Sequence, residues 1–180
     1  MSTRRRLLFM TMFAAGSMLL VVPGAFSQAF EVQASSGYVE ALLPALGWRQ
    51  AVVGRQVPAD SVVTAWQDAK AEMDYQGDSV TVGSFTHLRV LSVEADRVRL
   101  SLTSGSVTIK STTASFELDF RGTVVQVEKG AATVTDGVLT VATGDVRVVE
   151  KNAQPHVVQP GETLSLLSRQ TGSVFPVSSP

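Results

Sequence analysis

Two histidines, His87 and His156, are the residues of this 180-residue chain best suited to bind a metal or to transfer a proton near neutral pH. A mononuclear metal site would need further ligands that converge on one of them. The sequence contains no cysteine, which excludes disulfides, thiolate catalysis and Cys-ligated zinc. We therefore interpret each histidine as an ordinary polar residue at or near the surface, and we expect neither a metal site nor a cofactor.

Carboxylates are the other groups that could carry out catalysis. The HExxH, phosphate-loop and GxSxG motifs do not occur in the sequence. A glycosidase-type pair could in principle be assembled from distant acidic residues. The candidates are Asp60, Asp68, Glu72, Asp74, Asp78, Glu94, Asp96, Glu117 and Asp119. Because Glu117 and Asp119 alternate with apolar neighbours, we interpret them as the solvent-facing side of a strand. Since no catalytic motif is present either, we expect no enzymatic activity and no catalytic residue.

Three arginines form the first of two surface features that could bind a ligand. Arg89, Arg97 and Arg99 could line a small anion-binding patch. The alternative is a solvated strand face on which these side chains pair with acidic neighbours, such as Glu94 and Asp96.

Four aromatic residues form the second feature. Tyr38, Trp48, Trp66 and Tyr75 could form a platform for a sugar ring. Aromatic side chains of this kind more often pack in a core or an interface, and we favour that interpretation.

The segment HVVQPGETLSLLSRQTG, residues 156–172, resembles the opening of a LysM module, which binds peptidoglycan or chitin. That module would continue through a second helix and a closing strand, but only eight residues follow Gly172. The favoured interpretation is a last strand, a turn at Pro160-Gly161 and a tail. A peptidoglycan- or glycan-binding module is kept as the alternative function.

Apolar and polar residues alternate with period two through most of the chain, which is typical of strands buried on one side. The clearest segments are RVRLSL (97–102), SVTIK (106–110), FELDF (116–120), VVQVE (124–128), LTVAT (139–143) and VRVVE (146–150). The segment Val62–Tyr75 is ambiguous, because its Ala, Gln, Lys, Glu and Met residues favour helix. Its period-two pattern places Ala71, Met73 and Tyr75 on one side, and we interpret it as strand.

Turn-forming residues separate these segments at intervals of about ten residues. The predicted turns are QGDS (76–79), SGS (104–106), KGA (129–131), DG (136–137) and GD (144–145). Many short strands with tight Gly and Asp turns predict an all-β domain, as a roll, sandwich or solenoid.

The N-terminus has the pattern of a secretory signal. Arg4, Arg5 and Arg6 precede an uncharged run of 16 residues (7–22), and small residues occupy the cleavage region up to Ser27. We expect Sec-type export with cleavage after Ser27, although the run of arginines also loosely resembles a twin-arginine signal. An uncleaved anchor is the alternative, but the run is shorter than the ~20 residues that span a bilayer.

Export would make the protein periplasmic or extracellular, with membrane contact only during translocation. Loss of residues 1–27 removes three arginines and no acidic residue, which changes the net charge from −1 to about −4. A mildly acidic domain is a poor nucleic-acid binder, so we expect no nucleic-acid partner.

Taken together, these segments resemble a FecR domain over roughly residues 30–166. The residues that carry the resemblance are Trp48, Gly54, Val57, VVTAWQDAKAEM (62–73), SVTVGSFTHLRV (79–90), LSLTSGSVTI (100–109), Phe116, Gly122-Thr123, GDVRV (144–148) and VVQPGETL (157–164). The resemblance implies a periplasmic β-domain of the type that relays receptor occupancy to a sigma factor. Without a cytoplasmic segment, the chain is similar to stand-alone exported FecR-domain proteins.

We therefore expect a signal peptide (1–27), a FecR-like β-domain (28–168) and a flexible Pro/Ser-rich tail (169–180). The expected function is a non-catalytic protein-interaction or sensory domain of the cell envelope. Its expected partners are envelope proteins, bound by strand addition at an exposed sheet edge.

Overall fold

The computed structural model describes residues 28–150 and 154–167, and the predicted signal peptide and tail lie outside these residues. Within the described ranges, the chain forms seventeen strands and no helix, so the all-β prediction is confirmed. No segment in those ranges qualifies as a helical membrane span. The strands are β1 (Ala29–Ser36), β2 (Val39–Leu43), β3 (Gly47–Gln50), β4 (Gln56–Pro58), β5 (Val62–Ala65), β6 (Lys70–Tyr75), β7 (Asp78–Val82), β8 (Thr86–Val93), β9 (Arg97–Ser104), β10 (Ser106–Ser111), β11 (Ser115–Phe120), β12 (Thr123–Val127), β13 (Gly130–Thr135), β14 (Val138–Thr143), β15 (Val146–Glu150), β16 (His156–Val158) and β17 (Thr163–Ser165).

These strands form two open sheets that enclose one hydrophobic core. Over the described residues, sheet A has eight strands in the order β17-β14-β13-β10-β7-β6-β1-β4. Sheet B has nine, in the order β16-β15-β12-β11-β9-β8-β5-β2-β3. Among the described strand pairs, β9 and β11 alone are parallel, because the chain places β10 in sheet A between them.

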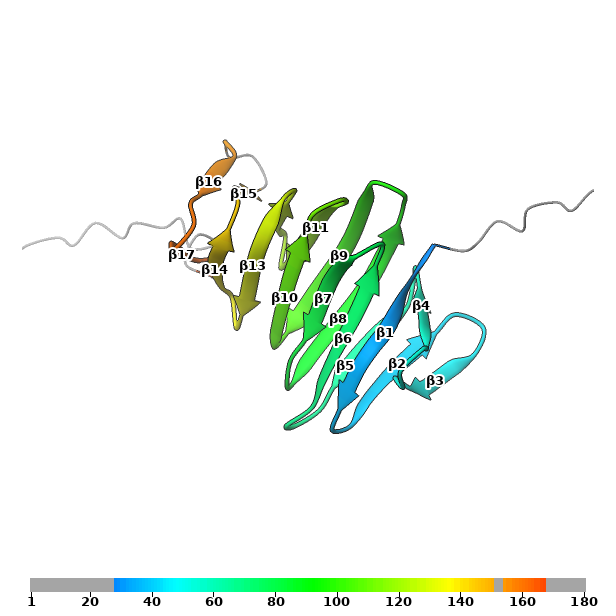
Figure 1. Ribbon diagram of the computed structural model, residues 1–180. Helices are drawn as coiled ribbons and strands as arrows, with labels where there is room; N and C mark the ends of the chain where they lie inside the picture. The colour runs from blue at the N-terminus through cyan, green and yellow to red at the C-terminus, as the bar shows by residue number, and fades with distance from the viewer. Residues whose placement is uncertain (1–27, 151–153, 168–180) are drawn as a thin grey trace, which may run out of the picture.

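The chain advances along the two sheets from one end of the molecule to the other. From β6 to β16 the chain mostly forms a two-stranded hairpin in one sheet and then crosses to the other sheet. Figure 1 shows this progression as a row of strands, with β1 to β4 at one end and β14 to β17 at the other. The first and last strands, β1 and β17, therefore lie near opposite ends of the row.

The predicted turns are of two kinds, which differ in their backbone geometry. Asp136-Gly137 joins β13 to β14 within sheet A, and both residues have positive φ (48° and 80°), as in a type I′ hairpin. The segment SGS instead crosses from β9 in sheet B to β10 in sheet A. Its Gly105 has φ 89°, and an added Cβ would lie 2.5 Å from the Cα of Thr86. Glycine is therefore required at this crossing by both backbone conformation and space.

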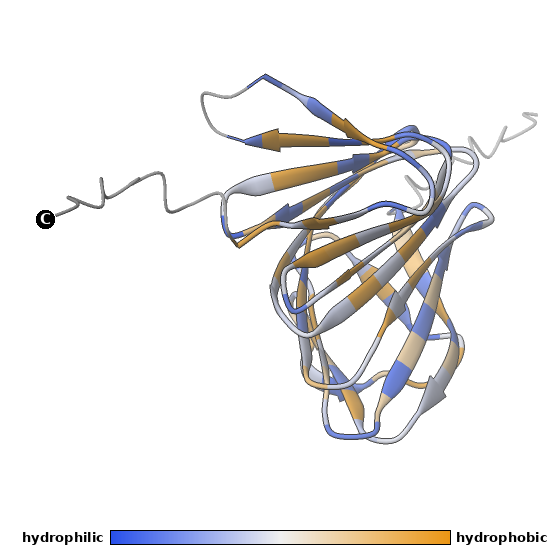
Figure 2. Ribbon diagram, turned by 90° about the vertical axis from the view of Figure 1, so that its left-hand side faces the viewer, coloured by the Kyte–Doolittle hydropathy of each residue, from blue (hydrophilic) through white to orange (hydrophobic). Residues whose placement is uncertain are grey.

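The core lies between the sheets and follows the period-two pattern. Hydrophobic and hydrophilic residues alternate along the strands (Figure 2). The ambiguous segment Val62–Tyr75 divides into β5 and β6, so its interpretation as strand is confirmed, and Ala71, Met73 and Tyr75 are buried as predicted. In the centre, the ring of Phe30 from sheet A packs 6.4 Å from that of Phe116 in sheet B.

A buried carboxylate fastens the crossing from β10 to β11. Asp78, at the start of β7, is fully buried and accepts backbone N–H hydrogen bonds from Thr112 (2.6 Å), Thr113 (3.1 Å) and Ala114 (2.7 Å). Burial raises the pKa of Asp78, but these hydrogen bonds outweigh it and hold the pKa below its ordinary value. The side chain therefore joins three loop residues to a strand more than thirty positions earlier in the chain.

Candidate functional site

The two histidines lie far apart on sheet B. His87 is on β8, inside the sheet, with its Nδ1 3.1 Å from the Oγ1 of Thr64, while His156 is on β16, an edge strand. Five strand spacings separate them, or roughly 24 Å. Within the described residues, no three His, Asp or Glu side chains are grouped closely enough to hold a metal ion.

The nine candidate carboxylates are spread over both sheets and several loops. Glu117 and Asp119 lie on the outward side of β11, as predicted. Asp119 accepts a hydrogen bond from the backbone N–H of Gly122 (2.8 Å), and so stabilises the β11–β12 turn. Asp78 has the structural role described above. These three positions therefore give a turn residue (Asp119), a carboxylate that holds a loop (Asp78) and a carboxylate on the outward side of a strand (Glu117).

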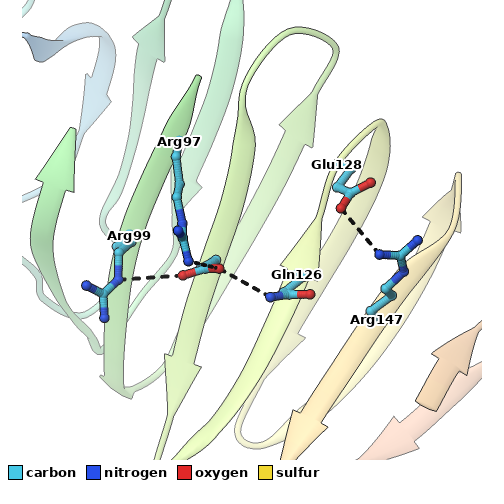
Figure 3. A network of polar contacts seen from close by, with 6 residues as sticks. Arg97, Arg99, Gln126, Glu128 and Arg147 are labelled. Carbon is cyan, nitrogen blue, oxygen red and sulfur yellow. Dashed lines mark hydrogen bonds and ion pairs between the residues drawn. The ribbon is translucent and has the colours of Figure 1, made fainter. Parts of the chain in front are cut away.

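Arg97 and Arg99 converge on the carboxylate of Glu117 across the parallel pair β9–β11 (Figure 3). Arg97 forms an ion pair with Glu117 Oε1, and the Nε of Arg99 lies 3.5 Å from Oε2. Of the two alternatives, the paired strand face describes Arg97 and Arg99, but their direct partner is Glu117 rather than Glu94 or Asp96. A cross-strand partner could not be identified without the register that places β11 beside β9.

The electrostatics of Arg97 reflect this arrangement. The hydrogen bond to Glu117 and the negative charge of that carboxylate raise the pKa of the guanidinium, with smaller contributions from Glu94 and Asp96. Arg89, the third predicted member, lies apart and is 3.7 Å from Asp60.

The polar contacts continue across β12 and β15. Gln126 donates to Glu117 Oε1 (3.2 Å), and Arg147 lies 3.6 Å from Glu128. Beside them is a cavity of about 300 Å³, lined by Gln126, Glu128, Lys129, Asp145 and Arg147. We call this outward side of β9, β11, β12 and β15 the charged face.

Three of the four predicted aromatic residues are exposed, so the core interpretation is wrong for them. Tyr38, Trp48 and Trp66 have 55%, 46% and 51% of their surface exposed. Tyr75 alone is buried, with its ring 5.9 Å from that of Phe30 and its hydroxyl donating to a backbone carbonyl. For Trp66 the error arose because both sides of the segment VVTAW (62–66) carry apolar residues, so the pattern did not reveal which side is buried.

The three exposed aromatic side chains lie on one side of sheet B. Val39 and Ala41 of β2 are buried, so Tyr38 and Glu40 are on the outward side. Residues Trp48 and Trp66 share that side, because β3 and β5 pair in register with β2. We call the outward side of β3, β2 and β5, with Tyr38, Glu40, Trp48 and Trp66, the aromatic face.

Glu40 holds two of these rings in place. The hydroxyl of Tyr38 donates to Glu40 Oε2 (3.1 Å), and the Nε1 of Trp66 donates to Oε1 (3.3 Å). The two rings lie 6.4 Å apart, and the backbone N–H of Trp66 donates to the carbonyl of Tyr38 (3.1 Å). The sequence analysis missed Glu40, although its alternation with Val39 and Ala41 was a signal for an outward carboxylate beside Tyr38.

The LysM-like segment does not begin a helix in its described part. Its first residues form β16, a turn follows at Pro160-Gly161, and Thr163–Ser165 form β17 in sheet A. The predicted last strand and turn are confirmed, and β17 adds a further strand where the LysM resemblance would have a helix. Residues 168–172 of the motif lie outside the described residues.

Comparisons with known proteins give few matches. No family model matches the chain, and no curated protein matches it. Two crystal structures of a "putative anti-sigma factor" from Parabacteroides distasonis are similar to it, with 17% identity and a TM-score of 0.47 for one, and 18% and 0.46 for the other. Each alignment covers 57% of this chain and 57% of the other, so little more than half of either protein is matched. The FecR resemblance stays a prediction.

Proposed function

We propose that the protein is an exported, non-catalytic interaction domain of the cell envelope, which binds a partner protein through the aromatic face. The observation that carries the proposal is the exposure of Tyr38, Trp48 and Trp66 on one side of neighbouring strands. Tyrosine and tryptophan are enriched at the centres of protein interfaces, where they contribute most of the binding energy. The N-terminal pattern of arginines and apolar residues supports export.

The position of the aromatic residues on the open side of a sheet favours a protein over a small substrate. Trp48 lies on β3 opposite Leu42, and Tyr38 and Trp66 lie next to the paired ends of β2 and β5. Enzyme sites are typically concave and enclose most of their ligand. Broad contact with another folded surface suits this geometry better than enclosure of a small molecule.

Strand addition at a sheet edge is a second route to the same partner, and we place it at β3. The hydrogen bond from Ala51 N–H to Val39 O sets the register, so that Trp48 and Gln50 direct their backbone groups away from β2. The carbonyl of Trp48 already accepts a hydrogen bond from the Arg49 side chain (2.8 Å). A partner strand would have to displace this side chain, which favours the face over the edge.

The test is photo-crosslinking in intact cells, with a photoreactive phenylalanine analogue at Trp48. Expected is a specific cross-linked envelope protein, with no such product when the probe replaces Thr140, an exposed residue of sheet A. The variant Gln50→Pro removes an outward N–H of β3 without removing a β2–β3 hydrogen bond. Capture that survives this variant supports the face, while capture lost with it supports the edge. Equal capture from both probe positions would contradict the proposal.

A further inference from the structure

Glu40 combines a carboxylate with two aromatic rings at one exposed point of sheet B. Each of its oxygens accepts one aromatic donor, the hydroxyl of Tyr38 or the indole N–H of Trp66. A carboxylate oxygen has two lone pairs, so each still has the capacity to accept a second hydrogen bond. The rings are fixed beside these free acceptor sites, because both donate to the same group.

The charge of Glu40 is not matched by a cation in the described part of the chain. There, Glu117 contacts two arginines and Glu128 contacts one, but no Lys, Arg or His nitrogen lies within 4.0 Å of a Glu40 oxygen. The neighbouring tyrosine reflects the negative charge: the hydrogen bond to Glu40 and the charge of that carboxylate raise the pKa of Tyr38. The aromatic face therefore carries a negative charge that its own residues leave without a cationic partner.

Aromatic rings add to the attraction for a cation. The face of a Trp or Tyr ring carries negative electrostatic potential and attracts ammonium and guanidinium groups within about 6 Å of the ring centre. An opposite charge on a nearby carboxylate acts in the same direction. In addition, a guanidinium plane can stack on a ring while its N–H groups donate to a carboxylate. Charge and ring geometry at Tyr38, Glu40 and Trp66 thus favour the same class of group.

We propose that Tyr38, Glu40 and Trp66 form a binding site for a cationic side chain, an arginine or a lysine, of the partner protein. This inference rests on the proposed function and names the chemistry of the group that the aromatic face receives. Trp48 lies on the same side of the sheet, where it offers apolar contact to residues that flank the cation. A neutral sugar would stack on the same rings and donate hydroxyl groups to Glu40, but it would bring no positive charge to offset that of the carboxylate.

A titration followed by NMR tests the site directly. The chain has two tryptophans, so the indole N–H signal of Trp66 is identified by comparison with the Trp48→Phe variant. The probes are the peptide acetyl-Gly-Arg-Gly-amide and a matched peptide in which neutral citrulline replaces arginine. We expect the arginine peptide to shift the Trp66 signal with an affinity about fivefold higher than the citrulline peptide.

Charge removal at Glu40 should reduce this preference. In Glu40→Gln, the arginine peptide should keep only the smaller advantage that the rings supply, well below fivefold, whereas the control Glu128→Gln, which removes one charge from the charged face, should keep the fivefold difference. Equal binding of both peptides to the wild type, or an unchanged preference in Glu40→Gln, would overturn the site. So would a shift of the Trp66 signal by a neutral N-acetylglucosamine oligomer without any shift by the arginine peptide, which would indicate a glycan site.

The same variant separates this inference from the proposed function. Cross-linking at Trp48 that is undiminished by Glu40→Gln would overturn the cation site and leave the interaction domain intact. If Trp48 captures no protein even in the wild type, the proposed function fails. A preserved peptide preference would then still support a site for cationic groups.

Discussion

The charged face and the aromatic face lie on the same outward side of sheet B and have similar strand geometry, but they treat their carboxylates differently. On the charged face, Arg97 and Arg99 satisfy Glu117, so the carboxylate is paired within the protein. On the aromatic face, Glu40 holds two exposed rings but has no cation beside it in the described residues. On the charged face the carboxylate therefore has its counter-charges within the protein, while on the aromatic face the carboxylate has a site open to a cation from outside.

The difference shows that exposure alone does not mark an interaction surface. Arg97 and Arg99 are about as exposed as Trp66, with 52% and 54% of their side chains accessible. Their hydrogen-bonding capacity is already used in part, and exposed ion pairs of this kind contribute little to stability or binding. Large apolar rings in water have no such internal compensation, so covering them with a partner is favourable.

The largest effect should come from the core that both faces share. Phe116→Ala should lower the free energy of unfolding by about 3–5 kcal/mol, because it leaves a cavity opposite Phe30. Urea unfolding followed by tryptophan fluorescence reports on the aromatic face, and far-UV circular dichroism reports on both sheets. The two transitions should coincide, and separate midpoints would show that the faces do not share one core. Phe85→Ala, at a residue 64% exposed, is the matched control and should change the midpoint little.

Next in size is the effect of Asp78, the buried carboxylate that holds the loop between β10 and β11. Asp78→Asn should cost about 2 kcal/mol at neutral pH, because an amide cannot accept all the N–H groups that meet the carboxylate. Since the pKa of Asp78 is lowered in the folded state, its stabilisation is present above the ordinary value of about 3.9 and is lost as the pH falls through the lower folded value.

Urea titrations between pH 2 and pH 7 check this dependence. The wild type should lose stability more steeply than Asp78→Asn in the acidic range. Equal slopes would show that the carboxylate contributes no linked protonation. Asp74→Asn, at a half-buried position of β6, keeps a side-chain oxygen that can accept from Gly77 N–H, so it is the control for a change of charge and should stay close to the wild type at pH 7.

A smaller effect is expected within the charged face itself. Glu117→Gln leaves Arg97 and Arg99 without their shared anion, so the urea midpoint should fall, by several times less than in Phe116→Ala. The loss should shrink in 0.5 M salt, because salt already screens the pairs in the wild type. A loss that does not depend on salt would mean that Glu117 acts through packing or neutral hydrogen bonds.

The smallest change in stability should come from the aromatic face. Glu40→Gln should leave the urea midpoint near the wild type, because the glutamine carbonyl still accepts one of the two aromatic donors. The variant should lower the pKa of Tyr38 toward its ordinary value, since the negative charge that opposes ionisation of the phenol is removed. Absorbance of tyrosinate during an alkaline titration measures this shift, and an unchanged titration would contradict the contact.

Much of the fold could be predicted from local pattern. Leu118 and Phe120 alternate with acidic residues because one side of β11 faces the core, and this period is visible in the sequence. Turns with two positive φ angles, such as Asp136-Gly137, were visible because few residue pairs tolerate them. The sequence could not distinguish them from the crossing at Gly105, since a glycine is required in both.

The parts that could not be predicted depend on residues distant in the chain. Asp78 reads as an ordinary turn residue, because its partners lie 34–36 positions later. The parallel pairing of β9 and β11 places Glu117 beside Arg99, and no local pattern specifies it. Glu40 and Trp66 lie 26 residues apart and meet only through the pairing of β2 with β5. The candidate site could therefore not be predicted, because it depends on which strands pair and in which register, and not on the composition of any one segment.

The placement of β1 and β17 near opposite ends of the strand row has a mechanical consequence. Tension applied between these two strands acts across the sheet, along the direction in which neighbouring strands are hydrogen-bonded about 4.8 Å apart. The hydrogen bonds between one pair of strands then break before those of the next pair, whereas tension along the strands would load all the hydrogen bonds of a pair at the same time. We therefore expect this fold to unfold under low force, with strands detaching in turn from one end of the sheets, even though in urea all strands should unfold in one cooperative transition.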